Sequence, residues 1–255
     1  MIAVAGARKT YPTGRQALAP VDLNVEPGEF VTLLGPSGCG KTTLLNLMAG
    51  LVEPSAGDLR WWGETFAATG VAGRRLAMVF QSPALMPWAR IDANVRLPLD
   101  LAGVPRTEST RNVEAALELV GLADAAAHYP RELSGGMQMR ASLARALVTA
   151  PDLLLMDEPF GALDEFTRHR LDGELLALWG ARRLTIVFVT HSIGEAVFLS
   201  TRVVVMAAQP GRIVATVPID QSHPRTAAFR VEPAFAEHCR HLSQLVADAA
   251  LGGAS

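Results

Sequence analysis

The sequence has few cysteines, few aromatic residues and no long hydrophobic run. Only two cysteines, Cys39 and Cys239, occur in 255 residues, and 6% of the residues are aromatic. Two cysteines exclude the disulfide framework of small secreted domains and fit a reducing compartment such as the cytosol. No stretch approaches the ~20 apolar residues of a membrane-spanning helix, and the N-terminus lacks a signal-peptide pattern. We therefore expect a chain that neither crosses nor enters a membrane.

An excess of positive charge is also missing. The chain has 23 basic and 25 acidic residues, which give a formal net charge of −2. Proteins that bind nucleic acid usually carry a strongly basic surface, because phosphate contacts dominate their affinity. The charge balance therefore argues against a DNA or RNA partner. The length suits one large domain, or one domain with a sub-lobe.

The most informative segment is a glycine-rich loop. It reads Gly35-Pro36-Ser37-Gly38-Cys39-Gly40-Lys41-Thr42 and fits the phosphate-binding pattern G-x-x-x-x-G-K-[ST]. An apolar run, Phe30–Leu34, precedes it, and a helical pattern, Thr43–Leu51, follows. Backbone N–H groups of such a loop and the positive end of the helix bind phosphate oxygens. With Lys41 as a point charge and Thr42 as a hydroxyl for Mg²⁺, the segment predicts a nucleoside triphosphate site.

Alternating strand and helix patterns predict an α/β core. Five apolar runs are typical of strands buried on both faces of a parallel sheet: Phe30–Leu34, Leu76–Phe80, Leu153–Met156, Thr185–Thr190 and Val203–Met206. Helical patterns cover Thr43–Leu51, Val113–Val120, Ser134–Thr149 and Glu165–Trp179. The segment from about residue 87 to residue 150 lacks clear strand patterns, and we expect it to form a mostly helical sub-lobe. Residues 221–255 are expected to be a linker, Gln221–Thr226, and a C-terminal packing helix, Pro233–Ala250.

Two adjacent acids follow the predicted strand Leu153–Met156. Asp157 and Glu158 stand at its carboxyl end, where open α/β sheets meet their ligands. Asp157 suits Mg²⁺, which takes one or two carboxylates beside phosphate oxygens and water. Glu158 suits a water that attacks the γ-phosphate in line. Such a pair is commonly a solvated turn, but the phosphate loop favours the functional interpretation.

A third motif, Leu133-Ser134-Gly135-Gly136-Met137, precedes a long helical pattern. Ser134 is a good N-cap, and the glycines let backbone N–H groups face an anion. Alone, this is only a helix start. Together with the phosphate loop and the acid pair, in this order and spacing, it resembles the ATP-binding subunits of ABC transporters over nearly the whole chain.

The resemblance implies a P-loop NTPase core of ABC-ATPase type over residues 1–220, with the helical sub-lobe and a short N-terminal β-rich part. It implies ATP and Mg²⁺ as ligands and assigns roles to individual residues. The residues implied to bind the nucleotide are Tyr11, Gly35, Pro36, Ser37, Gly38, Cys39, Gly40, Lys41, Thr42 and Thr43. Those implied to act in catalysis are Gln81, Glu158 and the switch histidine His191. Those implied to bind Mg²⁺ are Thr42, Gln81 and Asp157. The signature, Ser134, Gly135, Gly136 and Met137, would act on ATP held by a second copy, and Asp164 would belong to the D-loop, Ala162-Leu163-Asp164.

From the residues alone, plainer interpretations stay open for three of these positions. Tyr11 before Pro12 suits an ordinary turn, Gln81 a polar cap after a strand, and His191 a hydrogen-bonded core position. The sequence also departs from the family pattern at Met137, Met139 and Ser192, where glutamine, a polar residue and aspartate are more usual. Met139 puts a normal turnover rate in doubt.

Segments 84–88, 157–168 and 210–213 resemble the nitrate, sulfonate and taurine importer group, with the closest likeness to taurine-import ATPase subunits. This implies a head-to-tail homodimer that energises uptake of taurine or a related sulfonate. Its partners would be integral membrane permease subunits and, indirectly, a solute-binding protein, and it would lie peripherally on the cytoplasmic face of the inner membrane. Alternatives are an importer of nitrate or another small anion, a soluble ABC ATPase acting on nucleic acid or ribosomes, and a P-loop kinase. The kinase would leave the signature and His191 unexplained.

The segment Ser82–Ala93 combines prolines with Met86 and Trp88. Two interpretations remain open for it. It could form a groove that receives a short helix of the permease, or Trp88 could pack beneath the sub-lobe.

Overall fold

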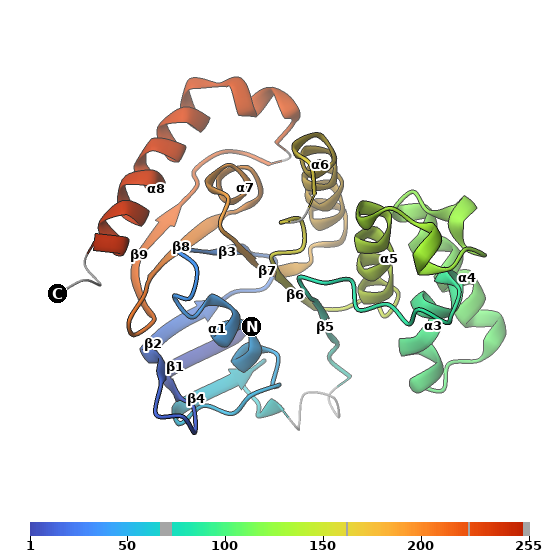
Figure 1. Ribbon diagram of the computed structural model, residues 1–255, viewed down its shortest axis with the longest axis horizontal. Helices are drawn as coiled ribbons and strands as arrows, with labels where there is room; N and C mark the ends of the chain where they lie inside the picture. Colours follow the sequence, from blue (N-terminus) through green and yellow to red (C-terminus); the bar gives the residue numbers. More distant parts are fainter. Residues whose placement is uncertain (67–72, 162, 224, 252–255) are drawn as a thin grey trace.

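The computed structural model describes residues 1–66, 73–161, 163–223 and 225–251, and its centre is a six-stranded sheet (Figure 1). The strand order is β5 (Leu76–Val79), β6 (Leu153–Asp157), β7 (Thr185–Thr190), β3 (Phe30–Leu34), β8 (Arg202–Ala207) and β9 (Arg212–Pro218). Neighbours pair in parallel, except that β9 is antiparallel to β8. The α/β fold and the five strands expected from apolar runs are confirmed, with ends within one residue of those expected.

Side chains of the central strands alternate between two hydrophobic cores. In β6, Leu154 and Met156 face one core, whereas Leu153 and Leu155 face the other. The first core also takes residues from α5 (Gly135–Leu147), α6 (Glu165–Arg182), α7 (Ile193–Leu199) and α8 (Pro233–Leu251); the second takes residues from α1 (Lys41–Met48). Because both faces of the sheet are covered, these strands read as continuous apolar runs in the sequence.

A second, antiparallel sheet covers α1 on the side away from the six-stranded sheet. Its order is β2 (Gln16–Val25), β1 (Ile2–Thr10) and β4 (Ala56–Trp61), drawn in blue and cyan in Figure 1. Ile2, Val4 and Leu23 share the core that contains Leu44 and Met48 of α1. The sequence predicted only a short β-rich part here, because irregular register between Val4 and Lys9 interrupts the alternation of buried and exposed residues.

Helices α3 (Ile91–Leu101), α4 (Arg106–Leu119) and α5 form a lobe to one side of the sheet (Figure 1). The helical character expected for segment 87–150 is therefore present. Helix α3 was not expected, because Pro98 lies inside it. Met139 of α5 is buried in the hydrophobic core, so it occupies an apolar position.

The linker expected at 221–226 contains a buried anchor. Arg225 is 6% exposed and donates hydrogen bonds of 2.7–3.1 Å to the carbonyls of Val197, Phe198 and Ser200 at the end of α7. These are carbonyls that a helix end leaves without internal partners. Arg225 therefore fixes the start of the C-terminal segment to α7. Pro224, beside it, lies outside the described residues.

No helix in the described part of the chain combines the length and the apolar character needed to span a bilayer.

Candidate nucleotide site

The phosphate loop joins β3 to α1 and depends on glycine at defined positions. Gly40, the N-cap of α1, has φ 93°, and a Cβ there would lie 2.6 Å from Leu18 Cδ2 and 3.0 Å from the Ala17 carbonyl oxygen. Gly38 also has a positive φ, of 76°. A side chain at either position would strain the backbone, and at Gly40 it would also push the loop away from β2.

Lys41 is folded back into this loop. Its side chain is buried, and Nζ donates hydrogen bonds to the carbonyls of Gly35 at 2.8 Å and Pro36 at 3.0 Å. These two bonds hold the ammonium inside the curve of the loop, where the N-terminal N–H groups of α1 also point. The loop is thus preorganised for an anion. Cys39 packs beneath it, and burial raises the pKa of its thiol, which favours the neutral form.

Thr42 and Asp157 connect the loop to the end of β6. The Thr42 hydroxyl donates a hydrogen bond of 3.1 Å to Oδ1 of Asp157. Asp157 is only 8% exposed, and burial raises the pKa of its carboxyl, while Thr42 and Lys41 oppose that shift. A buried carboxylate that is costly to ionise gains from a nearby cation. The hydroxyl and carboxylate oxygens are ligands that Mg²⁺ accepts.

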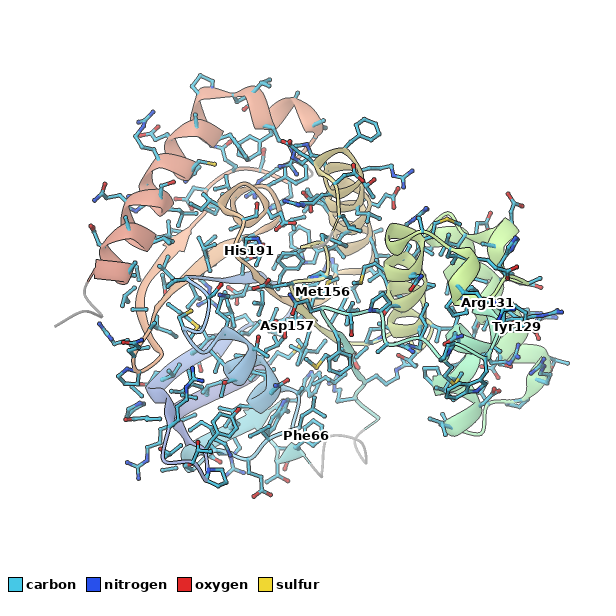
Figure 2. The ribbon with its side chains drawn as sticks, viewed as in Figure 1. Phe66, Tyr129, Arg131, Met156, Asp157 and His191 are labelled. Atoms are coloured by element: carbon cyan, nitrogen blue, oxygen red, sulfur yellow. The ribbon has the colours of Figure 1, made fainter. Side chains whose placement is uncertain are left out.

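Glu158 and His191 meet at the carboxyl ends of the neighbouring strands β6 and β7. Oε2 of Glu158 lies 3.1 Å from Nδ1 of His191. Glu158 has φ 44°, a left-handed conformation that is costly for a residue with a side chain, and its N–H donates to the Val189 carbonyl over 2.9 Å. Figure 2 labels Asp157 and His191 at this edge of the sheet. Strained backbone of this kind clusters at functional sites.

A cavity of about 340 Å³ opens at this edge. Of the residues singled out in the sequence, it is lined by Tyr11, Ser37, Gly38, Gly40, Lys41, Thr42, Thr43, Gln81 and Glu158. Gly35, Pro36, Cys39, Asp157 and His191 stand behind or beside this lining. The cavity therefore joins an aromatic ring, a phosphate loop, a carboxylate and an amide from four separate parts of the chain.

Arg15 and Ala17 also line the cavity and were missed in the sequence. Arg15 follows Tyr11 in the turn between β1 and β2, and its carbonyl accepts a hydrogen bond of 3.0 Å from the Tyr11 N–H. The turn thus presents the ring and a cation together. The only signal in the sequence was the closeness of Arg15 to Tyr11.

The signature residues and Asp164 lie outside this cavity. Ser134 caps α5 by accepting a 3.3 Å hydrogen bond from the Met137 N–H, and Asp164 caps α6 by accepting one of 2.9 Å from the Thr167 N–H. A Cβ on Gly136 would lie 3.4 Å from Thr167 Cγ2, so the starts of α5 and α6 adjoin. Ser134, Gly135, Gly136 and Met137 are therefore grouped with Asp164 and apart from the chain's own phosphate loop. Ala162 lies outside the described residues.

Taken together, the site offers a loop suited to phosphates and a carboxylate residue, Glu158, on the wall of the same cavity. The phosphate loop follows β3, and the acid pair lies at the end of β6, a parallel strand of the same sheet. Together these two features define a P-loop nucleoside triphosphatase.

Comparison with known proteins narrows this class. A family model described as ABC transporter matches residues 18–161. The chain belongs to the ABC transporter family, as an ATP-binding subunit whose ATPase activity is coupled to transport.

Relatives and solved structures support this family over most of the chain. A Brucella abortus protein named only for ATP binding is 46% identical over 223 residues, which cover 88% of this chain and 85% of that protein. The taurine import ATP-binding protein TauB of Chromobacterium violaceum is 49% identical, covering 81% and 78%. The aliphatic sulfonates import ATP-binding protein SsuB of Bacillus subtilis is 41% identical, covering 82% and 79%. These relatives confirm the resemblance to that importer group.

A solved ATP-binding cassette, a dimer in a post-hydrolysis state with bound ADP and Pi, superposes with a TM-score of 0.76. It is 31% identical in sequence, and the match covers 87% of this chain and 100% of the cassette. The fold of this chain is therefore that of an ABC ATPase.

Proposed function

We propose that this chain hydrolyses ATP to drive an importer of taurine or a related sulfonate, and that Glu158 is the residue that activates the attacking water. The observation that carries the proposal is the placement of the Glu158 carboxylate on the wall of the cavity that also holds Lys41 and Thr42. A carboxylate facing a phosphate loop can accept the proton of a water aligned with the γ-phosphate. His191, 3.1 Å from Glu158, can orient that carboxylate and donate to a phosphate oxygen.

The remaining roles follow from position in the cavity or directly beside it. The backbone of residues 35–43 and Lys41 would hold the phosphates, and the Tyr11 ring would stack on adenine. Thr42, Asp157 and Gln81 fit Mg²⁺, because they offer a hydroxyl, a buried carboxylate and an amide at one side of the loop. Mg²⁺ bound there would neutralise charge on the phosphate oxygens.

A second copy of the chain would complete each site. Ser134, Gly135, Gly136 and Met137 cannot act on this chain's own ATP from their position outside its cavity. The start of α5 is a helix N-terminus, which favours an anion. Phe166, beside Asp164, is 83% exposed, which suits burial against a partner. A head-to-tail homodimer would bring both features to the other copy's ATP, and the solved cassette is also a dimer.

The segment after Gln81 is the proposed docking site for a permease subunit. Arg145 donates hydrogen bonds to the carbonyls of Pro83 and Ala84 at 2.9 and 2.8 Å. The Met86 N–H donates a hydrogen bond of 2.7 Å to Oδ1 of the buried Asn94. These bonds fix the backbone while leaving Trp88 76% exposed. The interpretation that Trp88 packs beneath the sub-lobe is therefore wrong. A fixed loop with an exposed tryptophan suits docking of a helix from an integral membrane partner at the cytoplasmic face of the inner membrane.

The solute is supported only by the names of relatives, because the ATP site does not contact it. The test is uptake of labelled taurine, an alkanesulfonate and nitrate in cells lacking this chain, complemented with wild type or with Glu158→Gln. Loss of taurine or sulfonate uptake that only the wild type restores would support the proposal. Restored nitrate uptake alone would replace the sulfonate with another small anion, and no change for any of the three would contradict the importer role.

A further inference from the structure

Two buried acids and two half-buried arginines form a charge cluster beside His191. Arg168 and Asp172 come from α6, Glu195 from α7 and Arg230 from the short helix η3 (Ala227–Val231), and we call them the charge cluster. Asp172 and Glu195 are 0% and 4% exposed. None of the four lines the ATP cavity. Buried charges are costly unless they are paired, so the cluster needs an explanation beyond packing.

Glu195 connects the cluster to the residues on both sides of His191. Its Oε2 accepts a hydrogen bond from the Thr190 hydroxyl. That same Thr190 Oγ1 accepts one of 3.0 Å from the Ser192 N–H, and the Ser192 hydroxyl accepts one of 3.3 Å from the Glu195 N–H. The three residues form a closed set of bonds around the backbone of His191. The backbone that carries the imidazole is therefore tied to Glu195.

Arg168 extends the connection to the D-loop segment. Its Nη2 donates a 2.8 Å hydrogen bond to the Leu163 carbonyl, and its Nε lies 3.9 Å from Oε1 of Glu195. That Oε1 has no hydrogen-bond partner in the described part of the chain and is buried. Arg168 is thus the cation that balances Glu195 while holding the backbone before Asp164.

Arg230 brings the C-terminal segment into the same cluster. Its Nη2 donates a 2.6 Å hydrogen bond to Oδ2 of Asp172, and its guanidinium lies over the Phe198 ring at 3.9 Å from the centroid. A Cβ built on Gly194 would lie 3.8 Å from Phe235 Cζ of α8 and 4.0 Å from Arg230 Nη1, so both residues brace the first turn of α7. Arg230 therefore links α6, α7 and the C-terminal segment.

The geometry points to Glu195 and Arg230 as positioning residues for ATP hydrolysis, which hold His191 against Glu158 from outside the ATP cavity. The inference rests on the role proposed for His191 above. Without Arg230, Asp172 would lose its hydrogen-bonded partner, and the first turn of α7 would lose one of the side chains that brace it. The backbone that carries His191 would then be held less firmly. A small displacement of His191 is enough to slow a reaction that depends on alignment.

The test is a double-mutant cycle between Arg230→Gln and His191→Ala in the full chain, with kcat and KM for ATP measured for each protein. Arg230→Gln is expected to lower kcat about tenfold and to leave KM within about twofold, since alignment but not binding is lost. In the His191→Ala background the same change is expected to have no further effect on kcat. Arg230→Lys, which keeps the charge, is expected to recover most of the loss. Arg240→Gln is the control, because Arg240 of α8 is exposed.

Two results would overturn the inference. One is a normal kcat for Arg230→Gln; the other is an equal loss in both backgrounds, which would show a general structural effect. If Arg230→Gln does not fold, Thr190→Val removes the hydroxyl that connects Glu195 to Ser192 and is expected to show the same dependence on His191. A normal kcat for His191→Ala would contradict the role proposed for His191. A low kcat for His191→Ala, together with normal kcat values for Arg230→Gln and Thr190→Val, would reject this inference alone.

Discussion

Oε2 of Glu158 and Nδ1 of His191 lie 3.1 Å apart, although the two residues come from different strands and are separated by the whole of α6. The parallel pairing of β6 with β7 places their carboxyl ends side by side, with Asp157 opposite Val189. The register of two strands therefore determines whether the proposed general base and the residue proposed to orient it can meet.

Changing Glu158 to glutamine tests the proposed base. The amide keeps the size of the side chain but cannot accept a proton from water, so hydrolysis is expected to fall by about a hundredfold or more. ATP binding should persist, and size-exclusion chromatography with ATP should show a stable dimer. Glu174→Gln, at an exposed position of α6, is the control for loss of a carboxylate. Hydrolysis at the normal rate in Glu158→Gln would show that Glu158 is not the base.

Removing the Lys41 ammonium tests the phosphate loop. Lys41→Ala deletes a cation already held at 2.8 and 3.0 Å from two loop carbonyls. The affinity for ATP is expected to drop about tenfold to a hundredfold, since a charged hydrogen bond contributes about 1.5–3 kcal/mol. Equilibrium binding of a fluorescent ATP analogue measures this. Arg111→Ala, on the exposed side of α4, should bind normally, and equal affinities for both variants would contradict the site.

Stability should depend on pH through Asp172. Burial, together with nearby Glu195, raises the pKa of this carboxyl from 3.8 to about 7, despite the opposing effect of Arg230. Between about pH 4 and pH 7 the unfolded chain releases a proton that the folded chain keeps, so the free energy of unfolding falls as pH rises, by up to about 1.4 kcal/mol per unit from this group. Asp172→Asn should remove that slope in urea unfolding at pH 5, 6, 7 and 8. Asp58→Asn, at an exposed site, should retain it; parallel curves for Asp172→Asn and wild type would refute the assignment.

Trp88 should matter for assembly and not for ATP binding. Trp88→Ala is expected to weaken binding to the permease by about 2 kcal/mol, or about thirtyfold, as truncation of an exposed aromatic anchor typically does. The ATP affinity of the isolated chain should stay unchanged, because Trp88 does not line that cavity. Co-purification of tagged permease with each variant measures the effect, with Leu51→Ala as a control for another exposed apolar residue. Normal assembly and coupled transport in Trp88→Ala would remove this role.

The features that could be read from the sequence are those encoded locally. The phosphate loop occupies eight consecutive residues, and strands covered on both faces leave unbroken apolar runs. The register shifts of β1 and the proline inside α3, Pro98, interrupt the periodic patterns by which these two elements would have been predicted. The short helix α7 was not expected either, since it has only seven residues.

Residues that act through distant partners gave no such signal. Arg225 bonds main-chain carbonyls of α7, and any residue type offers a carbonyl. Arg230 and Asp172 form their pair across 58 positions, and neither stands in a recognisable motif. Arg15 enters the cavity only because of the turn that precedes β2. These positions needed the three-dimensional arrangement.

The position of β3 within the sheet has a consequence for biosynthesis. β3 carries the phosphate loop, yet its two neighbours, β7 and β8, are among the last strands to be made. The chain leaves the ribosome N-terminus first, so β3 and the phosphate loop emerge early. Most of the protein must then be synthesised before β3 gains a neighbouring strand on either side. A nascent chain that stalls before β7 would thus expose an apolar strand with no nucleotide site, which makes this interval the stage at which chaperones or aggregation would compete for it.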